Sequence, residues 1–556
     1  MISRRTFVRG LVAGGAATAF NGFIPRLAAQ HTRAQQTLQG TSFDLSIGET
    51  AMNFTGSPKI AQTINGSIPG PLLRWREGDT VSLRVRNDLD EDTSIHWHGI
   101  ILPANMDGVP GLSFHGIRPR ETYHYRFAVK QSGTYWYHSH SGFQEQRGVY
   151  GPLVIEPRDP DAITADREHV ILLSDWTDES PERVFAKLKK RADYYNFNQR
   201  TLGDFFNDVR AKGLSATLAD RGAWGDMRMN PTDLADVGGA TYTHLMNGIT
   251  PSGSWTGLFQ SGERVRLRFI NGSAMTYFDV RIPGLKMTVV AADGQPVHPV
   301  TVDEFRIATA ETFDVIVEPS GQDAFTIFAQ ALDRTAYAAG TLAVRDGLRA
   351  PVPALDARPL LTMADMGHGH DMSAHAGHDM PGMPKHAPSE AGNPLIDMQT
   401  QMAESKLSDP GIGLRDNGRT VLTYADLRSV FDDPDGRDPG RDIELHLTGH
   451  MEKFAWSFDG IKFSHAAPLL LKYGERVRII LVNDTMMTHP IHLHGMWSDL
   501  ENDAGEFVVR KHTIDMPPGS RRTYRVRADA LGRWAYHCHL LFHMEAGMFR
   551  EVRVDE

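Results

Sequence analysis

Cysteine is almost absent from this sequence, since Cys538 is the only one among 556 residues. A single thiol cannot form a disulfide within the chain, so core packing and bound groups must stabilise the fold. Long hydrophobic runs are also missing. The apolar stretch from Leu11 to Phe20 is too short and too rich in glycine to span a bilayer, so we expect no stable membrane span.

The sequence also lacks blocks of like charge. Its formal net charge is -10 and its pI is about 6.2, with acidic and basic residues mixed along the chain. A strongly basic face is therefore not expected, and the composition predicts no nucleic-acid partner. The length leaves room for three or more domains with a sizeable core.

The N-terminus has the pattern of an export signal. Arg4, Arg5 and Phe7 precede the short apolar run, and small residues continue through Ala29. An arginine pair alone is common near an N-terminus, but this order is typical of a twin-arginine signal peptide, which we assign to residues 1–34. The prediction is export of the folded protein by the twin-arginine machinery to the periplasm of a Gram-negative cell, with the outside of another kind of bacterium as the alternative.

One sequence motif with the pattern of a β-strand occurs three times, each time ending in an asparagine: Asn87, Asn271 and Asn483. Apolar residues alternate before each asparagine, as in Thr80–Arg86, and such alternation predicts a half-buried strand. A threefold repeat predicts three similar β modules. We place them at residues 41–158, 165–348 and 441–556.

Paired histidines follow the asparagine in two of the three copies. Nine and eleven residues beyond it stand His96 and His98 in the first copy and His492 and His494 in the third. The middle copy has Val280 and Ile282 there. Residues two apart on a strand face the same side, so each pair can bind a metal from one face.

A second set of histidines lies later in the same two copies. His138 and His140 in the first match His537 and His539 in the third, whereas the middle copy has none at residues 325–329, where we expect its counterpart. This pattern predicts a metal centre between the first and third modules, with the middle module as a spacer.

Cys538 stands between His537 and His539, with His543 and Met548 shortly after it. A thiolate, an imidazole and a thioether, joined by a second imidazole from His489, form a soft donor set that suits copper. The alternative is a buried cysteine with histidines nearby by chance.

Two segments interrupt the β pattern. Ser180 followed by Pro181 predicts a helix start. Leu202, Phe205, Phe206 and Val209 then recur at helical spacing. We expect a helical insertion at about residues 180–225 whose apolar stripe belongs to the core.

The second segment, residues 350–440, is dominated by Gly, Pro, Ala and Asp, and we expect a mobile surface loop that buries no core. Its centre combines thioethers and imidazoles, which together suit copper capture. The candidate ligands are Met363, Met366, His368, His370, Met372, His375, His378, Met380 and Met383, with His386 just beyond. The alternative is a linker with incidental histidines.

With these motifs the sequence resembles the multicopper oxidases over nearly the whole chain, and in particular their copper-resistance subgroup. Residues 227–233 and 242–248, the double-arginine start and the Met/His-rich stretch are similar to that subgroup. The resemblance implies an all-β fold of three cupredoxin-like Greek-key sandwiches and four coppers per chain. It implies a type 1 site of His489, Cys538, His543 and Met548, a type 2 site of His96 and His492, and a type 3 pair held by His98, His138, His140, His494, His537 and His539.

Two carboxylates are candidates for proton supply. Asp107 resembles the acidic residue that the family carries near type 2 copper, although a turn aspartate that caps its own loop is an alternative. Glu545 is equally well explained as a surface carboxylate. Met544 follows the type 1 histidine where some cuprous oxidases have an acid, which leaves the proton route in this segment open.

The function expected from this resemblance is a periplasmic oxidase that couples one-electron oxidation of Cu(I), and of phenols, to reduction of O2 to water. A copper-sequestering protein with incidental oxidase activity is the alternative. A copper nitrite reductase also has cupredoxin modules, but the additional histidine pairs, sufficient for a dinuclear site, argue against it.

Overall fold

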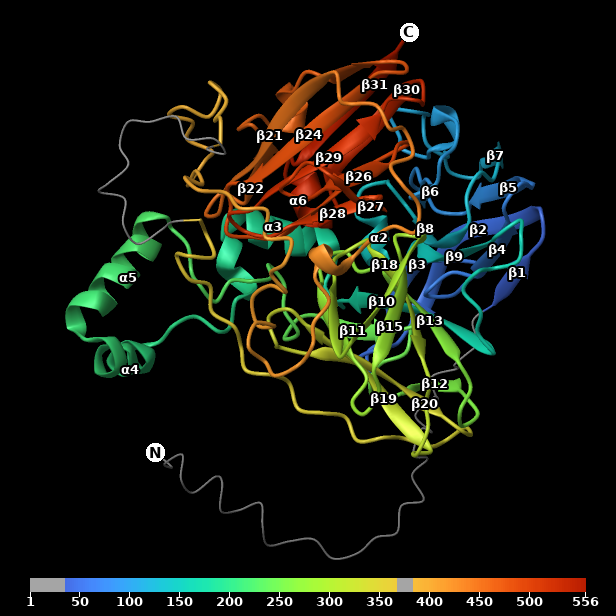
Figure 1. Ribbon diagram of the computed structural model, residues 1–556, viewed down its shortest axis with the longest axis horizontal. Helices are drawn as coiled ribbons and strands as arrows, with labels where there is room; N and C mark the ends of the chain where they lie inside the picture. The colour runs from blue at the N-terminus through green and yellow to red at the C-terminus, as the bar shows by residue number, and fades with distance from the viewer. Residues whose placement is uncertain (1–35, 368–383) are drawn as a thin grey trace, which may run out of the picture. The chain divides into compact units, whose positions relative to one another are not determined.

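The computed structural model describes residues 36–367 and 384–556, and most of its regular structure is β-strand (Figure 1). The first module has two sheets, with the orders β3-β2-β5-β7 and β1-β4-β9-β8-β6. Its elements are β1 (Thr37–Gln39), β2 (Ser42–Met52), β3 (Lys59–Ile64), β4 (Leu72–Arg76), β5 (Thr80–Asn87), β6 (His96–His98), β7 (Thr122–Ala128), β8 (Gly133–His138), α2 (Gln144–Arg147) and β9 (Tyr150–Glu156).

The second module has the sheets β11-β10-β13-β18-β15-β16 and β12-β20-β19-β14-β17. Its strands are β10 (Arg167–Trp176), β11 (Thr243–Met246), β12 (Trp255–Leu258), β13 (Val265–Asn271), β14 (Phe278–Arg281), β15 (Met287–Ala292), β16 (Gln295–Val302), β17 (Glu304–Ile307), β18 (Thr312–Val317), β19 (Ala324–Ala331) and β20 (Tyr337–Ala343). Three helices lie between its first two strands: α3 (Pro181–Lys190), α4 (Leu202–Lys212) and α5 (Leu214–Asp226).

The third module has the sheets β22-β21-β24-β29-β26-β27 and β23-β31-β30-β25-β28. Its elements are β21 (Arg441–His450), β22 (Ala455–Phe458), β23 (Leu469–Lys472), β24 (Arg476–Asn483), β25 (His489–Leu493), β26 (Ser498–Glu501), β27 (Phe507–Lys511), β28 (Thr513–Met516), β29 (Arg521–Arg527), β30 (Gly532–Cys538), α6 (Leu541–Glu545) and β31 (Phe549–Asp555). No helix in the described ranges is long and apolar enough to cross a membrane.

The repeated asparagine makes the same contacts in all three modules. Asn271 ends β13, is fully buried, and donates from Nδ2 to the carbonyls of Thr276 and Ile307, at 2.8 and 3.1 Å, while its Oδ1 accepts from Ser273 N. Asn87 and Asn483 bond in the same way at the ends of β5 and β24. A buried amide that satisfies three backbone groups fixes the turn into the next strand, which in the first and third modules leads into the histidine pair.

These observations confirm the predicted fold class: the chain is all-β, with three cupredoxin-like Greek-key sandwiches. The predicted half-buried strand is β5, whose side chains alternate between exposed and buried. In the middle module Val280 on β14 pairs with Ala329 on β19, where the third module pairs His492 with His537.

The helical insertion begins as predicted, with Ser180 as N-cap and Pro181 at the first position of α3. The expected burial of the α4 stripe is wrong, because no residue of α4 is buried, and Leu202 and Phe206 are 79% and 64% exposed. α4 packs against the helix α5, where Arg221 lies over the ring of Phe205, and the two helices lie apart from the sheets (Figure 1). Helical spacing predicted the helix, but burial also needs a partner surface.

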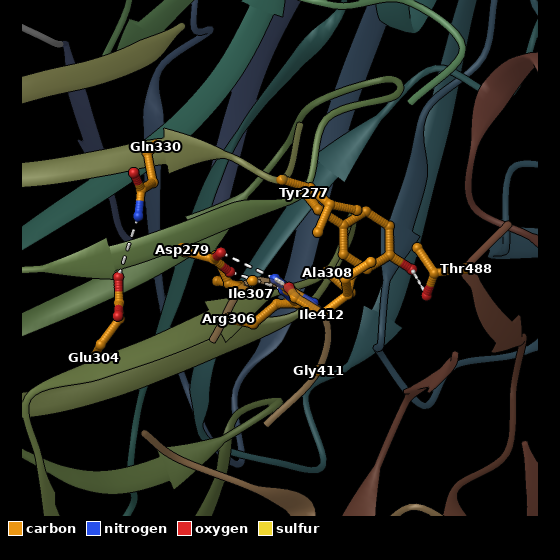
Figure 2. Close-up of polar contacts among 12 residues, drawn as sticks. Tyr277, Asp279, Glu304, Arg306, Ile307, Ala308, Gln330, Gly411, Ile412 and Thr488 are labelled. Atoms are coloured by element: carbon orange, nitrogen blue, oxygen red, sulfur yellow. Dashed lines mark hydrogen bonds and ion pairs between the residues drawn. The ribbon is translucent and has the colours of Figure 1, made fainter. Parts of the chain in front are cut away.

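The expectation of a linker without a core is wrong for its described parts, residues 350–367 and 384–440. They have almost no regular structure, yet Leu361, Met366, Leu414 and Leu427 are buried in the hydrophobic core. Figure 2 shows Arg306 of β17 bound both to Asp279 and to the linker carbonyl of Ile412. Polar contacts to neighbouring modules therefore hold a segment whose composition alone suggested a free loop.

Candidate metal centres

Cys538, His489 and His543 meet inside the third module. β25 begins with His489, the last residue of the adjacent strand β30 is Cys538, and His543 lies on α6. The two imidazole Nδ1 atoms are 3.1 Å apart and lie 3.5 and 3.9 Å from Cys538 Sγ. All three side chains are buried, so the two strands and the short helix place one sulfur and two nitrogens around a common point.

The outer nitrogen of each imidazole has its own partner. His489 Nε2 lies 2.7 Å from Thr485 Oγ1, and His543 Nε2 lies 2.8 Å from Asp236 Oδ2. These contacts fix both rings with Nδ1 toward the sulfur, as partners of metal-bound histidines do. Met548 is fully buried, and its carbonyl accepts a hydrogen bond from the Cys538 amide at 3.1 Å.

Burial raises the pKa of the Cys538 thiol well above its ordinary value, so the free thiol is protonated at neutral pH. A cation between the sulfur and the two imidazoles would favour the thiolate instead. Thiolate together with imidazole is a donor set that suits copper.

Eight further histidines meet where the first module contacts the third. They are His96, His98, His138, His140, His492, His494, His537 and His539, and all are buried except His140, which is partly exposed. His96 stacks on His494 with ring centroids 3.9 Å apart, and His98 stacks on His492 at 3.8 Å. The pairs that the sequence placed in two separate modules therefore come together.

Most of these rings are anchored through Nδ1. His96 Nδ1 lies 2.8 Å from the Asp107 carbonyl, and His494 Nδ1 lies 2.8 Å from Asp107 Oδ2. The Nδ1 atoms of His138, His492 and His537 likewise lie within 3 Å of the oxygens of Glu145, His512 and Cys538, respectively. Since an oxygen acceptor holds the proton on Nδ1, Nε2 presents a lone pair to the centre of the cluster.

His98 is oriented the other way round. Its Nε2 lies 3.2 Å from His512 Nδ1, while its Nδ1 is buried and has no hydrogen-bond partner among the described residues. His96 Nε2 and His492 Nε2 are buried without a partner as well. Unsatisfied buried nitrogens cost free energy unless something binds them.

The facing nitrogens repel each other in the absence of a cation. His537 Nε2 lies 3.2 Å from His140 Nε2 and 3.1 Å from His494 Nε2, although His537 and His494 carry their protons on Nδ1. Burial lowers the pKa of His537 to about 3, and it lowers the pKa of His98 well below its ordinary value, with neighbouring imidazoles adding to the effect. These imidazoles are therefore neutral at physiological pH, which is the form that binds copper.

Family comparison agrees with this geometry. Three family models described as multicopper oxidase match residues 46–160, 167–346 and 436–556. The chain belongs to the multicopper oxidase family. It is an oxidoreductase, and the family's cofactor is copper.

Full-length relatives place the oxidase in the copper-resistance subgroup. It is 65% identical to copper resistance protein A of Escherichia coli and 66% identical to the copper resistance protein A homolog of Pseudomonas syringae pv. tomato, each over 100% of this chain and 99% of the relative. The multicopper oxidase MmcO of Mycobacterium tuberculosis is 30% identical over 89% of this chain and 83% of its own length.

Solved structures agree on the fold. The multicopper oxidase Fet3p, which functions in iron import, superposes with a TM-score of 0.66 at 19% identity, over 93% of this chain and 91% of that one. A laccase from Botrytis aclada gives 0.63 at 21% identity, over 93% and 88%.

Several residues that orient the oxidase's histidines were not found from the sequence. Asp236, Thr485, Glu145 and His512 contact candidate ligands through side chains or carbonyls. None belongs to a repeated motif, so only their position in the fold identifies them. Of these four, only His512 is of a residue type that suggests a role in a histidine cluster. The structure places it directly before β28, the strand that pairs with β25.

The middle module does more than separate the other two. Asp293, at the end of β15, accepts hydrogen bonds at Oδ2 from the backbone amides of His512 and Thr513, both at 3.1 Å, and binds the buried Lys511 at 3.0 Å. It thereby holds the segment that contacts His98. The description of this module as a spacer was incomplete.

The remaining candidate residues differ in their placement. Asp107 is buried against His96 and His494. Glu545 lies at the exposed end of α6 and, in the described part of the chain, makes no hydrogen bond to a ligand histidine. Partial desolvation raises the pKa of Glu545 above its ordinary value.

The Met/His-rich candidates are only partly described. Met363 packs against the core, and Met366 is fully buried in it, so hydrophobic packing accounts for Met366 and we omit it from the copper-gathering set. The other seven candidates, between residues 368 and 383, lie outside the described residues.

Replacing Asp236 by asparagine is expected to lower kcat/KM for reducing substrates by about 10- to 100-fold, because the carboxylate no longer orients His543. Steady-state oxygen consumption measures the loss, and the thiolate-to-copper absorption band should shift. Asp233→Asn is the matched control, since burial raises the pKa of Asp233 well above its ordinary value and asparagine resembles the protonated acid. Equal activity of the two variants would show that Asp236 has no positioning role.

Proposed function

We propose that this multicopper oxidase is exported to the periplasm, where it takes single electrons from Cu(I), and from phenols as a second class of donor, and reduces O2 to water. Its similarity to copper resistance proteins and the double-arginine start support this proposal.

The observation that carries the proposal is the position of Cys538 between the two centres. Its side chain contacts His489 and His543, whereas its neighbours His537 and His539 belong to the histidine cluster. Successive residues of a strand face opposite sides, so β30 directs Cys538 one way and His537 the other. The His537 Nδ1 proton is also donated to the Cys538 carbonyl at 2.9 Å. A short covalent and hydrogen-bonded connection therefore joins the two centres.

We assign four coppers to these side chains. Type 1 copper would be held by His489, Cys538, His543 and Met548; type 2 by His96 and His492; and the type 3 pair by His98, His138, His140, His494, His537 and His539. Bound copper supplies the one-electron redox chemistry and stores the electrons that reduction of O2 needs. The chain keeps the rings neutral, fixes their tautomers and excludes water by burial.

A hollow of about 670 Å³ reaches the partly exposed His140. Arg533, Glu545 and Phe549 also line it. We propose it as the route by which O2 enters and water leaves. Asp107 would keep its place beside His96 and His494 and assist proton supply to that cluster.

The choice of Cu(I) as substrate is tested by changing the Met/His-rich stretch at constant length. Methionines 372, 380 and 383 are replaced by leucine, and histidines 368, 370, 375 and 378 by glutamine. The kcat/KM for Cu(I) is expected to fall by about tenfold, equivalent to about 1.4 kcal/mol, because thioethers and imidazoles no longer gather the ion. Oxidation of a phenolic dye should be unchanged. Equal losses for both donors, or none for Cu(I), would remove this stretch from the proposal.

A further inference from the structure

A third group of imidazoles and carboxylates, outside both centres, lies where the linker packs on the third module. His446 is on β21, and Asp484 follows the last residue of the parallel neighbour β24. His386 and Glu390 come from the linker, within its described residues 384–440. Strand pairing places His446 opposite Val482, and Asp484 N donates to the Leu447 carbonyl, so the sheet sets these two side chains next to each other.

The four side chains face one another at short range. Asp484 Oδ2 lies 2.6 Å from His446 Nδ1 and 3.5 Å from His386 Nδ1. Glu390 lies 2.9 Å from His386 Nδ1 through Oε2 and 4.0 Å from His446 Nδ1 through Oε1. Four ligands at about 2.0 Å in a tetrahedron lie about 3.3 Å from each other, so only small movements would let these atoms share one ion.

The surroundings of His446 resemble those of a metal-bound histidine. Its Nδ1 faces Asp484 and Glu390, while its Nε2 lies 3.3 Å from Glu444 Oε1. Histidine ligands commonly donate their second N–H to a carboxylate in this way. Glu390 and Asp484 are fully buried, whereas the His386 side chain is 27% exposed and offers a way in.

We propose that His386, Glu390, His446 and Asp484 form a site for one divalent transition-metal ion, with Cu(II) the preferred occupant. Two imidazoles and two carboxylates without a thioether favour a divalent ion over Cu(I), and among divalent ions Cu(II) binds such donors most strongly. The site is independent of the proposed electron donor. It adjoins the loop that runs from Asp484 through Thr485 to His489.

An ion-pair network is the competing explanation, and the chain contains one for comparison. Lys511 lies 3.0 Å from both Asp293 and Glu311, where a lysine supplies a fixed positive charge. In the His386 group both positive partners are imidazoles, which can exchange a proton for a metal. Both Nδ1 atoms lie within 4.0 Å of oxygens of both carboxylates, so all four side chains can direct a donor atom at one shared ion.

The test uses the full-length, copper-loaded oxidase and Zn(II) as the probe, because zinc accepts the same donors and is not reduced. Bound zinc is counted by equilibrium dialysis for wild type, His446→Gln, His386→Gln and the control His465→Gln. His465 is an exposed histidine of the same module whose Nδ1 lies 3.0 Å from Ser464 Oγ. Since the Met/His-rich stretch is identical in all four proteins, any zinc that it binds adds equally to each count and does not affect the difference between proteins.

We expect wild type and His465→Gln to bind one more zinc ion than His446→Gln or His386→Gln, with affinity at that site reduced by about 100-fold or more in each variant. Added Cu(II) should displace the zinc. Zinc should also raise the Tm of wild type but not that of the two variants. If His446→Gln does not fold, His386→Gln decides, since His386 lies at the partly exposed edge. Equal zinc counts in all folded proteins would overturn the proposal and leave an ion-pair network.

Discussion

Replacing Cys538 by serine is expected to lower oxygen consumption with every reducing substrate by at least about a thousandfold, equivalent to about 4 kcal/mol of activation free energy. The side chain is fully buried and adjoins His489 and His543. Serine fits the same space, but its hydroxyl is a hard donor that does not ionise at neutral pH. The site would then lose the soft ligand that selects copper.

Absorption and paramagnetic resonance spectra distinguish a variant that has lost only this metal centre from a variant that has not folded. The thiolate-to-copper absorption band should disappear from Cys538→Ser, whereas the paramagnetic resonance signal of type 2 copper should remain, because no histidine of the cluster has changed. An active serine variant would contradict the role given to Cys538. If this variant consumes no oxygen but still protects cells from copper, sequestration rather than oxidation is the protective function.

A second large effect is expected at His492, with the opposite spectroscopic result. Its Nε2 is buried without a hydrogen-bond partner in the part of the chain that the structure describes, and its Nδ1 is fixed by the His512 carbonyl at 2.6 Å. In His492→Gln an amide replaces the imidazole, so the cluster should lose one of the two ligands assigned to type 2 copper. Oxygen consumption is again expected to fall by at least about a thousandfold.

The four residues assigned to type 1 copper are unchanged in this variant. Substrate should therefore bleach the thiolate-to-copper band, and O2 should fail to restore it in stopped-flow measurements. His124→Gln, at an exposed position of β7, serves as the control and should behave as wild type. Normal reoxidation of His492→Gln by O2 would contradict the assignment of His492 to the oxygen-reducing cluster.

The repeats made the fold predictable. Each strand pattern ends in an asparagine with the same buried contacts, so equal sequence produced equal local structure in three places. The histidine pairs follow that asparagine at a fixed distance, and strand alternation sends both members of a pair to one face. Motifs of this kind are local, so they can be recognised from the sequence alone.

Burial was predicted less well. Phe206 repeats at helical spacing but is exposed, whereas Met366 sits in a stretch rich in glycine and aspartate but is buried. Both errors have one cause. An apolar side chain is buried only if a distant part of the chain supplies a surface to pack against. The composition of a short sequence segment does not show whether such a surface exists.

The sequence by itself determined the three β modules, the histidine register and the one cysteine placed between two of those histidines. Only the tertiary structure decided which groups hold the imidazoles in place: Asp236 on His543, Thr485 on His489, and Asp293 on the backbone of His512. It also decided that His386 and His446 share carboxylates. Ligands recur with the repeat because strand geometry is local, whereas their partners come from other modules and meet them only when the modules pack together.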